Sequence, residues 1–469
     1  MALPDPGMSL EDRLYPLLRL YEAAPQPVKT LAGSAFRLLP SAWRHGRAYE
    51  TFRREAALAE TWDAKTLHDY QLTALRDSLI AAGQAPFYAR RFAEAGVDPR
   101  TFESLEQLSG YPLLSKADLL EHREAMVNPQ VPAARRLYLT TGGSSGVPVG
   151  FYLERGVSRP KEQAYLEAMW SRRGYRPGDR VAVIRGGVTS SRVGGKISSH
   201  DATRDWLILS SYHLTPDRLA EYVALLNRFR PRHLHAYPSA ALMLARGMEQ
   251  SGLKLDFPLV SVLCGSEKLD EQAQRYLEQF FACRVFHWYG HSERVVLAGQ
   301  GRRSDHLYFW PTYGFVEFGE PDAEGLREVI GTSFHNRAMP LIRYRTGDRV
   351  RLSKDPEREL SMMMEADAVE GRDYEFLVSS TGRRISLTAI NMHDRIFDGL
   401  LAVQFAQGRA GEVEFRYQPG PGWPSTRLDT MHAGLLHKLG DDFSLVMRQV
   451  AAVEKTPAGK HRWLVRLSS

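Results

Sequence analysis

The sequence predicts an α/β protein with a large multilayer N-terminal domain and a small α+β C-terminal domain. Three observations lead to this fold class. Strand-like and helix-like runs alternate from about residue 137 to residue 350, as they do when helices join parallel strands. Residues 305–353 are mostly β, which predicts a small sheet or a distorted β-barrel-like part beside the α/β layers. Residues 376–469 read as a compact α+β unit.

The chain has 469 residues, which is too many for one ordinary hydrophobic core, so we expect two or more domains. We place the N-terminal domain at residues 1–370, with a helical N-terminal part at 1–130. We place the C-terminal domain at residues 371–469, a stretch long enough to fold as a small domain of its own.

Residues 9–60 carry apolar residues at helical spacing, and their second half is basic, with lysine and arginine spread from Lys29 to Arg54. A basic amphipathic helix can lie on a membrane surface, but most amphipathic helices face a hydrophobic core. We favour a helical hairpin packed on the main domain. Peripheral membrane contact through residues 9–60 is the alternative.

Between residues 181 and 290, apolar runs that read as strands are separated by longer runs that read as helices. The expected strands are Val181–Ile184, Leu207–Ser210, His233–Tyr237, Leu259–Gly265 and Cys283–Gly290. The expected helices are Pro216–Phe229, Ser239–Ser251 and Asp270–Phe281. This order is typical of parallel strands.

The C-terminal region mixes both kinds of element. Its expected strands are Leu401–Gln407, Glu412–Tyr417 and Phe443–Val453. Its expected helices are Leu387–Phe397 and Thr426–Leu439.

The composition, with 43% hydrophobic and 25% charged residues, is that of an ordinary globular protein. A net charge of +6 favours acidic small molecules but is too weak to indicate nucleic acid without a clustered basic face. No apolar run is long enough for a transmembrane helix, and the first residues lack the basic start of a signal peptide. Cys264 and Cys283 are too few for a disulfide framework. We expect a cytoplasmic protein of undetermined oligomeric state.

The segment Leu137–Glu154 contains seven consecutive small residues between two β-like runs. These residues are Thr140, Thr141, Gly142, Gly143, Ser144, Ser145 and Gly146. Glycines let a backbone approach a ligand closely, and consecutive N–H groups in such a loop form a nest for an anion. The loop is neither a Walker A motif nor a dinucleotide fingerprint. It therefore indicates a polyphosphate cradle, with an exposed hairpin loop as the alternative.

Three further segments follow in order: HWYGHSE at His287–Glu293, YRTGDRV at Tyr344–Val350, and TPAGKHR around Lys460. Together with TTGGSSGVP they resemble the signature segments of the adenylate-forming superfamily of acyl-CoA synthetases and peptide-synthetase adenylation domains. The resemblance is closer to the phenylacetate–CoA ligase branch and its CapK-like relatives from capsule and exopolysaccharide loci. APFYARRFAEAG and YPLLSKADL (Ala85–Gly96 and Tyr111–Leu119) resemble the N-terminal region of that branch.

The resemblance implies an enzyme that uses ATP and Mg²⁺ to activate a carboxylic acid as acyl-AMP with release of pyrophosphate. Transfer to CoA, or to the phosphopantetheine of a carrier, would follow. A CapK-like enzyme that passes the acyl group to an amine, hydroxyl or carrier thiol in polysaccharide biosynthesis is the first alternative. A non-catalytic nucleotide-binding relative is the second.

The resemblance also implies roles for the individual segments that contact the nucleotide. The Thr140–Gly146 loop would hold the β- and γ-phosphates, and Val149 stands where the family often has a lysine. Gly265, Ser266 and Glu267 would lie against the adenine. Alternatively, Ser266 or Glu267 caps the helix that follows.

In the YGHSE segment, the resemblance implies that Tyr289 stacks on adenine, Ser292 contacts the α-phosphate and Glu293 holds Mg²⁺, with Gly290 and His291 in the same nucleotide-binding turn. His287 and His291 could instead be zinc ligands. The segment lacks the internal glutamate of an H-E-x-x-H motif, so we favour the first interpretation.

The remaining implied residues lie toward the C-terminus. Asp348 would accept hydrogen bonds from both ribose hydroxyls, although an aspartate after a glycine is also an ordinary turn residue. Arg372 would add positive charge near the nucleotide, at a hinge about which the small domain moves, and the hinge residue falls near Tyr374. Lys460 would bridge the carboxylate and the α-phosphate and stabilise the developing charge.

Overall fold

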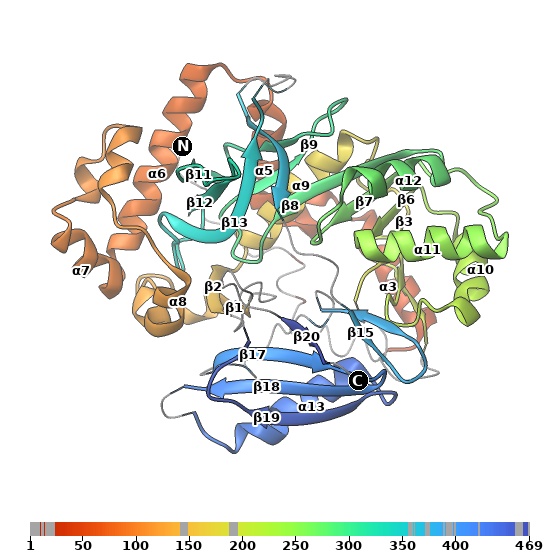
Figure 1. Ribbon diagram of the computed structural model, residues 1–469. Coiled ribbons are helices and arrows are strands. Elements are labelled where there is room, and N and C mark those ends of the chain that lie inside the picture. The colour runs from red at the N-terminus through yellow and green to blue at the C-terminus, as the bar shows by residue number, and fades with distance from the viewer. Residues whose placement is uncertain are drawn as a thin grey trace.

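The computed structural model shows a large α/β domain above a smaller C-terminal sheet (Figure 1). The structure describes residues 10, 14, 24–140, 149–186, 196–354, 360, 362–370, 376–387, 390, 397, 400–420, 423–454 and 463–467.

The N-terminal part is helical, as the apolar spacing predicts. Its helices are α3 (Gln26–Leu38), α4 (Ser41–Arg44), α5 (Gly46–Ala59), α6 (Ala64–Gly83), α7 (Pro86–Glu94) and α8 (Lys116–His122). Short 3₁₀ turns link them to the next strand (Pro99–Thr101, Leu105–Gly110, Arg123–Met126 and Ala133–Arg135). The start of α6 is fixed by Asp63, whose side chain accepts the N–H of Thr66, and the start of α8 by a capping box between Ser115 and Asp118.

The two β-like runs of the small-residue segment form an antiparallel hairpin of β1 (Arg136–Thr140) and β2 (Gly150–Glu154), with Thr140 opposite Gly150. A Cβ at Gly150 would lie 2.1 Å from the Tyr138 hydroxyl, so any other residue at this position would displace the end of the Tyr138 side chain. The two predicted strands that flank the loop are thus confirmed. Its loop, Thr141 to Pro148, lies outside the described residues.

One sheet of twelve strands organises the large domain. Its strands, in order across the sheet, are β11 (Gly314–Phe318), β12 (Arg327–Ser333), β13 (Tyr344–Leu352), β14 (Met364–Glu370), β10 (Leu307–Phe309), β9 (Leu297–Gln300), β8 (Arg284–Gly290), β7 (Ser261–Gly265), β6 (His233–Ala236), β3 (Val181–Ile184), β5 (Trp206–Leu209) and β4 (Ser198–Asp201).

Five neighbouring strands, β8, β7, β6, β3 and β5, run parallel to one another. At one end of the sheet, β4 pairs antiparallel with β5. At the other end, antiparallel pairing continues from β8 through β9, β10, β14, β13 and β12 to β11. The predicted α/β fold class is confirmed. The β-rich region 305–353 differs from a separate small sheet, because β9 turns back beside β8 and lets the later strands extend the same sheet.

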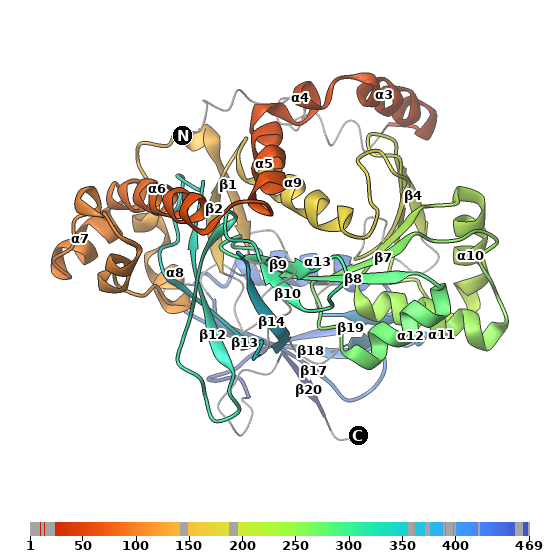
Figure 2. The same ribbon diagram turned by 90° about the horizontal axis from the view of Figure 1, so that it is seen from above.

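Helices cover both faces of the parallel half, as Figure 2 shows from above. Ala182 and Ile184 pack with α10 (Leu219–Phe229), α11 (Pro238–Ser251) and α12 (Glu271–Phe281). Val181 and Val183 point the other way and pack with α5 and α9 (Ser158–Ser171). Alternate residues of a strand point to opposite faces, so both faces of β3 are buried. A 3₁₀ turn, Pro216–Arg218, precedes α10.

A third core lies under the antiparallel half of the sheet. There the β1–β2 hairpin and the helices α6, α7 and α8 bury apolar side chains against β9 to β14. Val149 is fully buried in this core with Phe151 and Leu153. A charged lysine at position 149 would therefore be costly here.

The C-terminal region contains a hairpin, β15 (Phe376–Val378) and β16 (Arg384–Ser386), and a four-stranded sheet with α13 (Arg427–Leu439). The sheet order is β19 (Ser444–Gln449), β18 (Glu412–Pro419), β17 (Leu400–Gln407) and β20 (Leu464–Arg466). The predicted strands and the second predicted helix are thus found. The first predicted helix, Leu387–Phe397, falls mostly outside the described residues.

A buried ion pair holds the C-terminal hairpin to the turn that precedes β19 of the four-stranded sheet. Arg383 donates through Nε to Asp442 Oδ2 at 2.8 Å and pairs with Oδ1 through Nη2. The Arg383 side chain also points its Nη1 at the Tyr212 carbonyl of the large domain at 3.5 Å. The boundary between residues 370 and 371 remains a prediction, since residues 371–375 lie outside the described part.

The helices of residues 26–59 are partly packed and partly exposed. The α5 residues Phe52 and Ala56 are buried against α9, as the favoured prediction requires. In contrast, Leu31 and Leu38 of α3 are 76% and 87% exposed and Trp43 of α4 is 67% exposed. Within the described chain, no helix has the length and apolar character needed to span a bilayer.

Candidate functional site

The carboxyl ends of four neighbouring parallel strands bring together residues that are far apart in the sequence. Arg185 follows β3, Tyr237 follows β6, Ser266 follows β7 and His291 follows β8. The strand order β8–β7–β6–β3 therefore places these positions in a row along one edge. In open α/β sheets, ligands bind at this edge.

Two tyrosines connect the YGHSE and YRTGD segments, because Tyr344 and Asp348 of β13 lie beside the end of β8. The Tyr289 hydroxyl donates to Asp348 Oδ2 at 2.8 Å. The Tyr344 hydroxyl donates to Glu293 Oε1 at 3.0 Å. The structure thus brings the two predicted carboxylates, Glu293 and Asp348, to one place.

Both tyrosines are buried, and burial raises the pKa of Tyr289 and of Tyr344 well above the usual value. The neighbouring carboxylates Asp348 and Glu293 raise these two pKa values further. Each phenol therefore keeps its proton and acts as a donor. A carboxylate that accepts such a bond is held in place in its ionised form.

His291 forms an ion pair with the same glutamate, with Nδ1 3.3 Å from Glu293 Oε2. Burial alone would lower the pKa of His291, but Glu293 raises it above the usual 6.5. Burial alone would raise the pKa of Glu293, but His291 lowers it below the usual 4.5. Glu293 is therefore ionised at neutral pH. Ser292, which lies between His291 and Glu293 in the sequence, is half-buried.

The loop that carries these residues is anchored to α9 by the residue that follows Glu293. Arg294 takes a left-handed conformation with φ 55° and donates through Nη1 to the Ser158 carbonyl at 2.7 Å. Its Nε lies 3.7 Å from Glu162 Oε2, and the Tyr313 hydroxyl donates to that same oxygen. This anchor fixes the direction in which Glu293 points.

Gly265, Ser266 and Glu267 form a strand-to-helix turn at the end of β7. A Cβ at Gly265 would lie 2.3 Å from the Trp288 indole, so only glycine fits. Ser266 takes a left-handed conformation with φ 70°. The Glu267 carboxylate accepts the Ser239 N–H at the start of α11, at 3.1 Å. The helix α12 is capped by Asp270 instead, whose side chain accepts the Ala273 N–H.

The zinc interpretation finds no support in the geometry of the two histidines. His287 lies on strand β8, and its Nε2 is 2.9 Å from the Glu267 carbonyl oxygen. Among the residues that the structure describes, no three His, Cys, Asp or Glu side chains gather as a metal site.

Several predicted site residues cannot be placed. Thr140 is buried at the end of β1, but Thr141, Gly142, Gly143, Ser144, Ser145 and Gly146 lie outside the described residues. Arg372, Tyr374 and Lys460 do as well. Their roles remain predictions.

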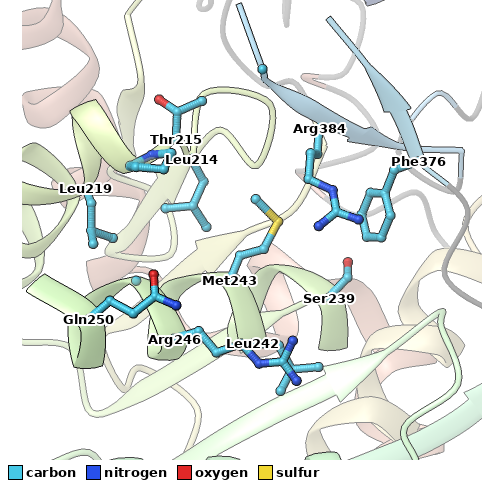
Figure 3. Close-up of a pocket in the computed structure, with 13 residues that line it drawn as sticks. Leu214, Thr215, Leu219, Ser239, Leu242, Met243, Arg246, Gln250, Phe376 and Arg384 are labelled. Carbon is cyan, nitrogen blue, oxygen red and sulfur yellow. The ribbon is translucent and has the colours of Figure 1, made fainter. Parts of the chain in front are cut away.

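A cavity of about 440 Å³ lies where the C-terminal hairpin meets the large domain. Phe376 and Arg384 line it from the hairpin, opposite Ser239 and Met243 of α11 (Figure 3). The lining is mostly apolar. Because Ser239 also contacts Glu267, the cavity adjoins the carboxyl edge of the sheet.

Two residues of this edge were missed by the sequence interpretation. Tyr344 is the first residue of the YRTGD segment, and that segment was the available signal. Arg185 is the first residue after a predicted strand, so the same carboxyl-end rule that singled out Gly265 would have found it.

Comparison with known proteins agrees with this fold. CapK from Staphylococcus aureus is 22% identical over 370 residues, which cover 78% of this chain and 81% of CapK. Phenylacetate-coenzyme A ligase from Pseudomonas putida is 29% identical over 337 residues, 68% of this chain and 73% of that protein. No protein-family model matches the sequence.

Among solved structures, 2-hydroxyisobutyryl-CoA ligase in the postadenylation state has the same fold, with a TM-score of 0.54 and 18% identity. The match covers 92% of this chain and 94% of that one. The chain is thus similar in sequence and in fold to adenylate-forming CoA ligases, as its four motifs indicate. The relatives that it matches along most of its length include phenylacetate–CoA ligases and CapK.

Proposed function

We propose that the protein is a ligase that activates a carboxylic acid with ATP and then transfers the acyl group to CoA. The observation that carries this proposal is the pair of carboxylates, Glu293 and Asp348, held by two buried tyrosines at the carboxyl ends of the parallel strands. The similarity to phenylacetate–CoA ligases over two thirds of the chain supports it.

The nucleotide would lie across the ends of β7 and β8. Asp348 would accept both ribose hydroxyls, because a carboxylate offers only acceptors to a vicinal diol. The turn at Gly265 and Ser266 would lie against the base. Tyr289, whose hydroxyl is already used by Asp348, would offer the face of its ring.

Mg²⁺ fits the donor set at Glu293. Mg²⁺ in nucleotide sites is held by one or two carboxylates together with substrate phosphates and water, so a lone ionised glutamate is sufficient. Bound there, it would neutralise phosphate charge. The protein's own contribution is to keep Glu293 ionised and aimed, through Tyr344, His291 and the Arg294 anchor.

In the first step, an oxygen of the acid's carboxylate attacks the α-phosphorus of ATP. A new P–O bond forms, the bond to the bridging oxygen breaks and pyrophosphate leaves. Lys460 would stabilise the charge that develops on the α-phosphate, and the loop that begins at Thr140 would hold the departing phosphates. In the second step, the sulfur of a thiol attacks the acyl carbonyl and AMP leaves.

The acceptor would approach through the cavity between Arg384 and α11, which lies beside the carboxyl edge and is lined by both domains. We infer that the small domain, residues 371–469, moves between the two steps. Transfer to an amine, hydroxyl or carrier thiol, which the resemblance to CapK-like enzymes implies, is the alternative.

ATP–pyrophosphate exchange against a panel of aryl and aliphatic acids tests the first step. We expect acid-dependent exchange by the natural protein and a large loss in Lys460→Ala. Absence of exchange with every acid, in protein that is folded by circular dichroism, would contradict adenylation. Dependence of product formation on CoA then separates the ligase from the CapK-like alternative.

We infer further that the exposed face of α3 and α4 contacts a membrane surface. Leu31, Leu38 and Trp43 project to solvent there, and Lys29 and Arg44 lie on the same two helices. Apolar and basic residues together are typical of helices that bind anionic lipid. Flotation with vesicles of anionic phospholipid should recover the natural protein and lose the Leu31→Glu/Leu38→Glu variant. Equal flotation of both would contradict this contact.

A further inference from the structure

Arg185 is a charged residue of the carboxyl edge to which the proposed reaction assigns no role. It follows β3 directly, is half-buried and stacks on Tyr237, with its guanidinium carbon 4.7 Å from the ring centroid. Its Nη1 is 3.1 Å from His235 Nε2, and its Nη2 donates to the Ser266 hydroxyl.

Both hydrogen-bond partners of Arg185 are uncharged. Burial, together with the charge of Arg185, lowers the pKa of His235 well below the usual value, so the imidazole is neutral and accepts through Nε2. No carboxylate among the described residues forms an ion pair with Arg185, and Glu267 on the adjacent turn accepts the Ser239 N–H instead. The charge of Arg185 is therefore not balanced within the described chain.

A guanidinium has five N–H groups, and the contacts to His235 and Ser266 use two of them. The stacking on Tyr237 fixes the plane of the group. A guanidinium group that is held in one orientation and has unused N–H donors is suited to bind a planar anion such as a carboxylate.

The position of Arg185 along the edge indicates which ligand it would meet. Glu293 and Asp348 mark the β8 end, where the proposed nucleotide lies, and Ser266 follows on β7. The next two strands in the row are β6 and β3. The proposed nucleotide covers only the ends of β7 and β8, so the ends of β6 and β3, with Tyr237 and Arg185, are left for the far end of the acid.

We propose that Arg185 binds a second anionic group at the far end of the acid, so that the preferred substrates are acids with two negative charges, such as dicarboxylates. This inference rests on the proposed function for the placement of the reacting carboxylate. It concerns specificity, and the exchange reaction itself does not require it.

The test compares acids in matched pairs, hexanoate with adipate and phenylacetate with 4-carboxyphenylacetate, by kcat/KM for ATP–pyrophosphate exchange. The natural protein should favour the dianionic member of at least one pair. Arg185→Gln should reduce that preference about ten- to hundredfold. Arg185→Lys should keep part of it, because it retains the charge and loses the fork.

Arg230→Gln is the matched control, since Arg230 lies at the opposite, amino-terminal edge of the sheet, where it pairs with Asp256 at 3.0 Å. It should leave the preference unchanged. Equal loss for both members of a pair in Arg185→Gln would show that Arg185 holds the reacting carboxylate and would overturn the proposal. A preference for the neutral acids would do the same.

A binding measurement separates this inference from the proposed function. Calorimetric titration of the same acid pairs, in the presence of the non-reacting analogue α,β-methylene-ATP, needs no turnover. Tighter binding of the dianionic acid to the natural protein than to Arg185→Gln, without any exchange, would support Arg185 and contradict adenylation. Exchange with no charge preference in either measurement would support adenylation and contradict the role of Arg185.

Discussion

The β8 end and the β3 end of the carboxyl edge hold their charged side chains in different ways. At the β8 end, Glu293 and Asp348 each accept a hydrogen bond from a buried tyrosine, and Glu293 is also paired with His291. At the β3 end, Arg185 has two neutral partners and no countercharge among the described residues. The β8 end is therefore organised by the protein itself, whereas the β3 end is organised to receive charge from a ligand.

The largest effect is expected from removing the charge at the organised end. Glu293→Gln should reduce ATP–pyrophosphate exchange about 10²–10³-fold, because an amide holds Mg²⁺ less well than a carboxylate and the phosphate charge would then lack its cation. Exchange measured over a range of Mg²⁺ concentrations checks this. Glu328→Gln, which loses an exposed pair with Arg345 on β13, is the control and should keep full activity.

The second carboxylate should matter less and in a more specific way. Asp348→Asn should reduce kcat/KM for ATP about ten- to hundredfold, because a hydrogen bond to a charged acceptor contributes about 1.5–3 kcal/mol. The natural protein should discriminate against 2′-deoxy-ATP, and the variant should lose that discrimination. Unchanged discrimination in Asp348→Asn would place the ribose elsewhere.

The tyrosine that holds Glu293 should affect stability. Tyr344→Phe should lower the free energy of unfolding by about 1–2 kcal/mol, because it removes a donor from a buried carboxylate. Urea denaturation measures this. Tyr276→Phe removes the same kind of bond, to Glu249 at the surface, and should cost less. Equal costs would mean that burial does not strengthen the bond.

The smallest effect is a pH dependence of stability. Because the folded pKa of His291 is raised, its contribution is complete below pH 6.5 and is lost as pH rises through the folded value. Because the pKa of Glu293 is lowered, its contribution is complete above pH 4.5 and is lost as pH falls through the folded value. His291→Gln should remove the loss on the alkaline side, which denaturation at a series of pH values would reveal.

The parallel half of the sheet was predictable from sequence because its strands are buried on both faces and therefore read as apolar runs. The expected strand Val181–Ile184 coincides with β3, and the expected helix Asp270–Phe281 differs from α12 by one residue. In contrast, β14 was not predicted. It alternates acidic residues with methionine and alanine, and only pairing with β10 and β13 makes it a strand.

The site residues that belong to sequence motifs could be predicted. The contacts between residues far apart in the sequence could not. Glu293 and Asp348 stand in recognisable segments. The bonds from Tyr289 to Asp348 and from Tyr344 to Glu293 join residues 59 and 51 positions apart. Such pairs depend on the position of β13 relative to β8, which no local pattern contains. The same reason hid the contacts of Arg185 with His235 and Ser266.

The contact between Gly265 and Trp288 has a consequence for how this enzyme can change its substrate. A methyl group at position 265 would overlap the indole, so the turn proposed to lie against the base cannot be reshaped by mutation of Gly265. Diversification through evolution, or by directed mutagenesis, would have to act on the ends of β3 and β6. New acid preferences should therefore arise there without disturbing how ATP is bound.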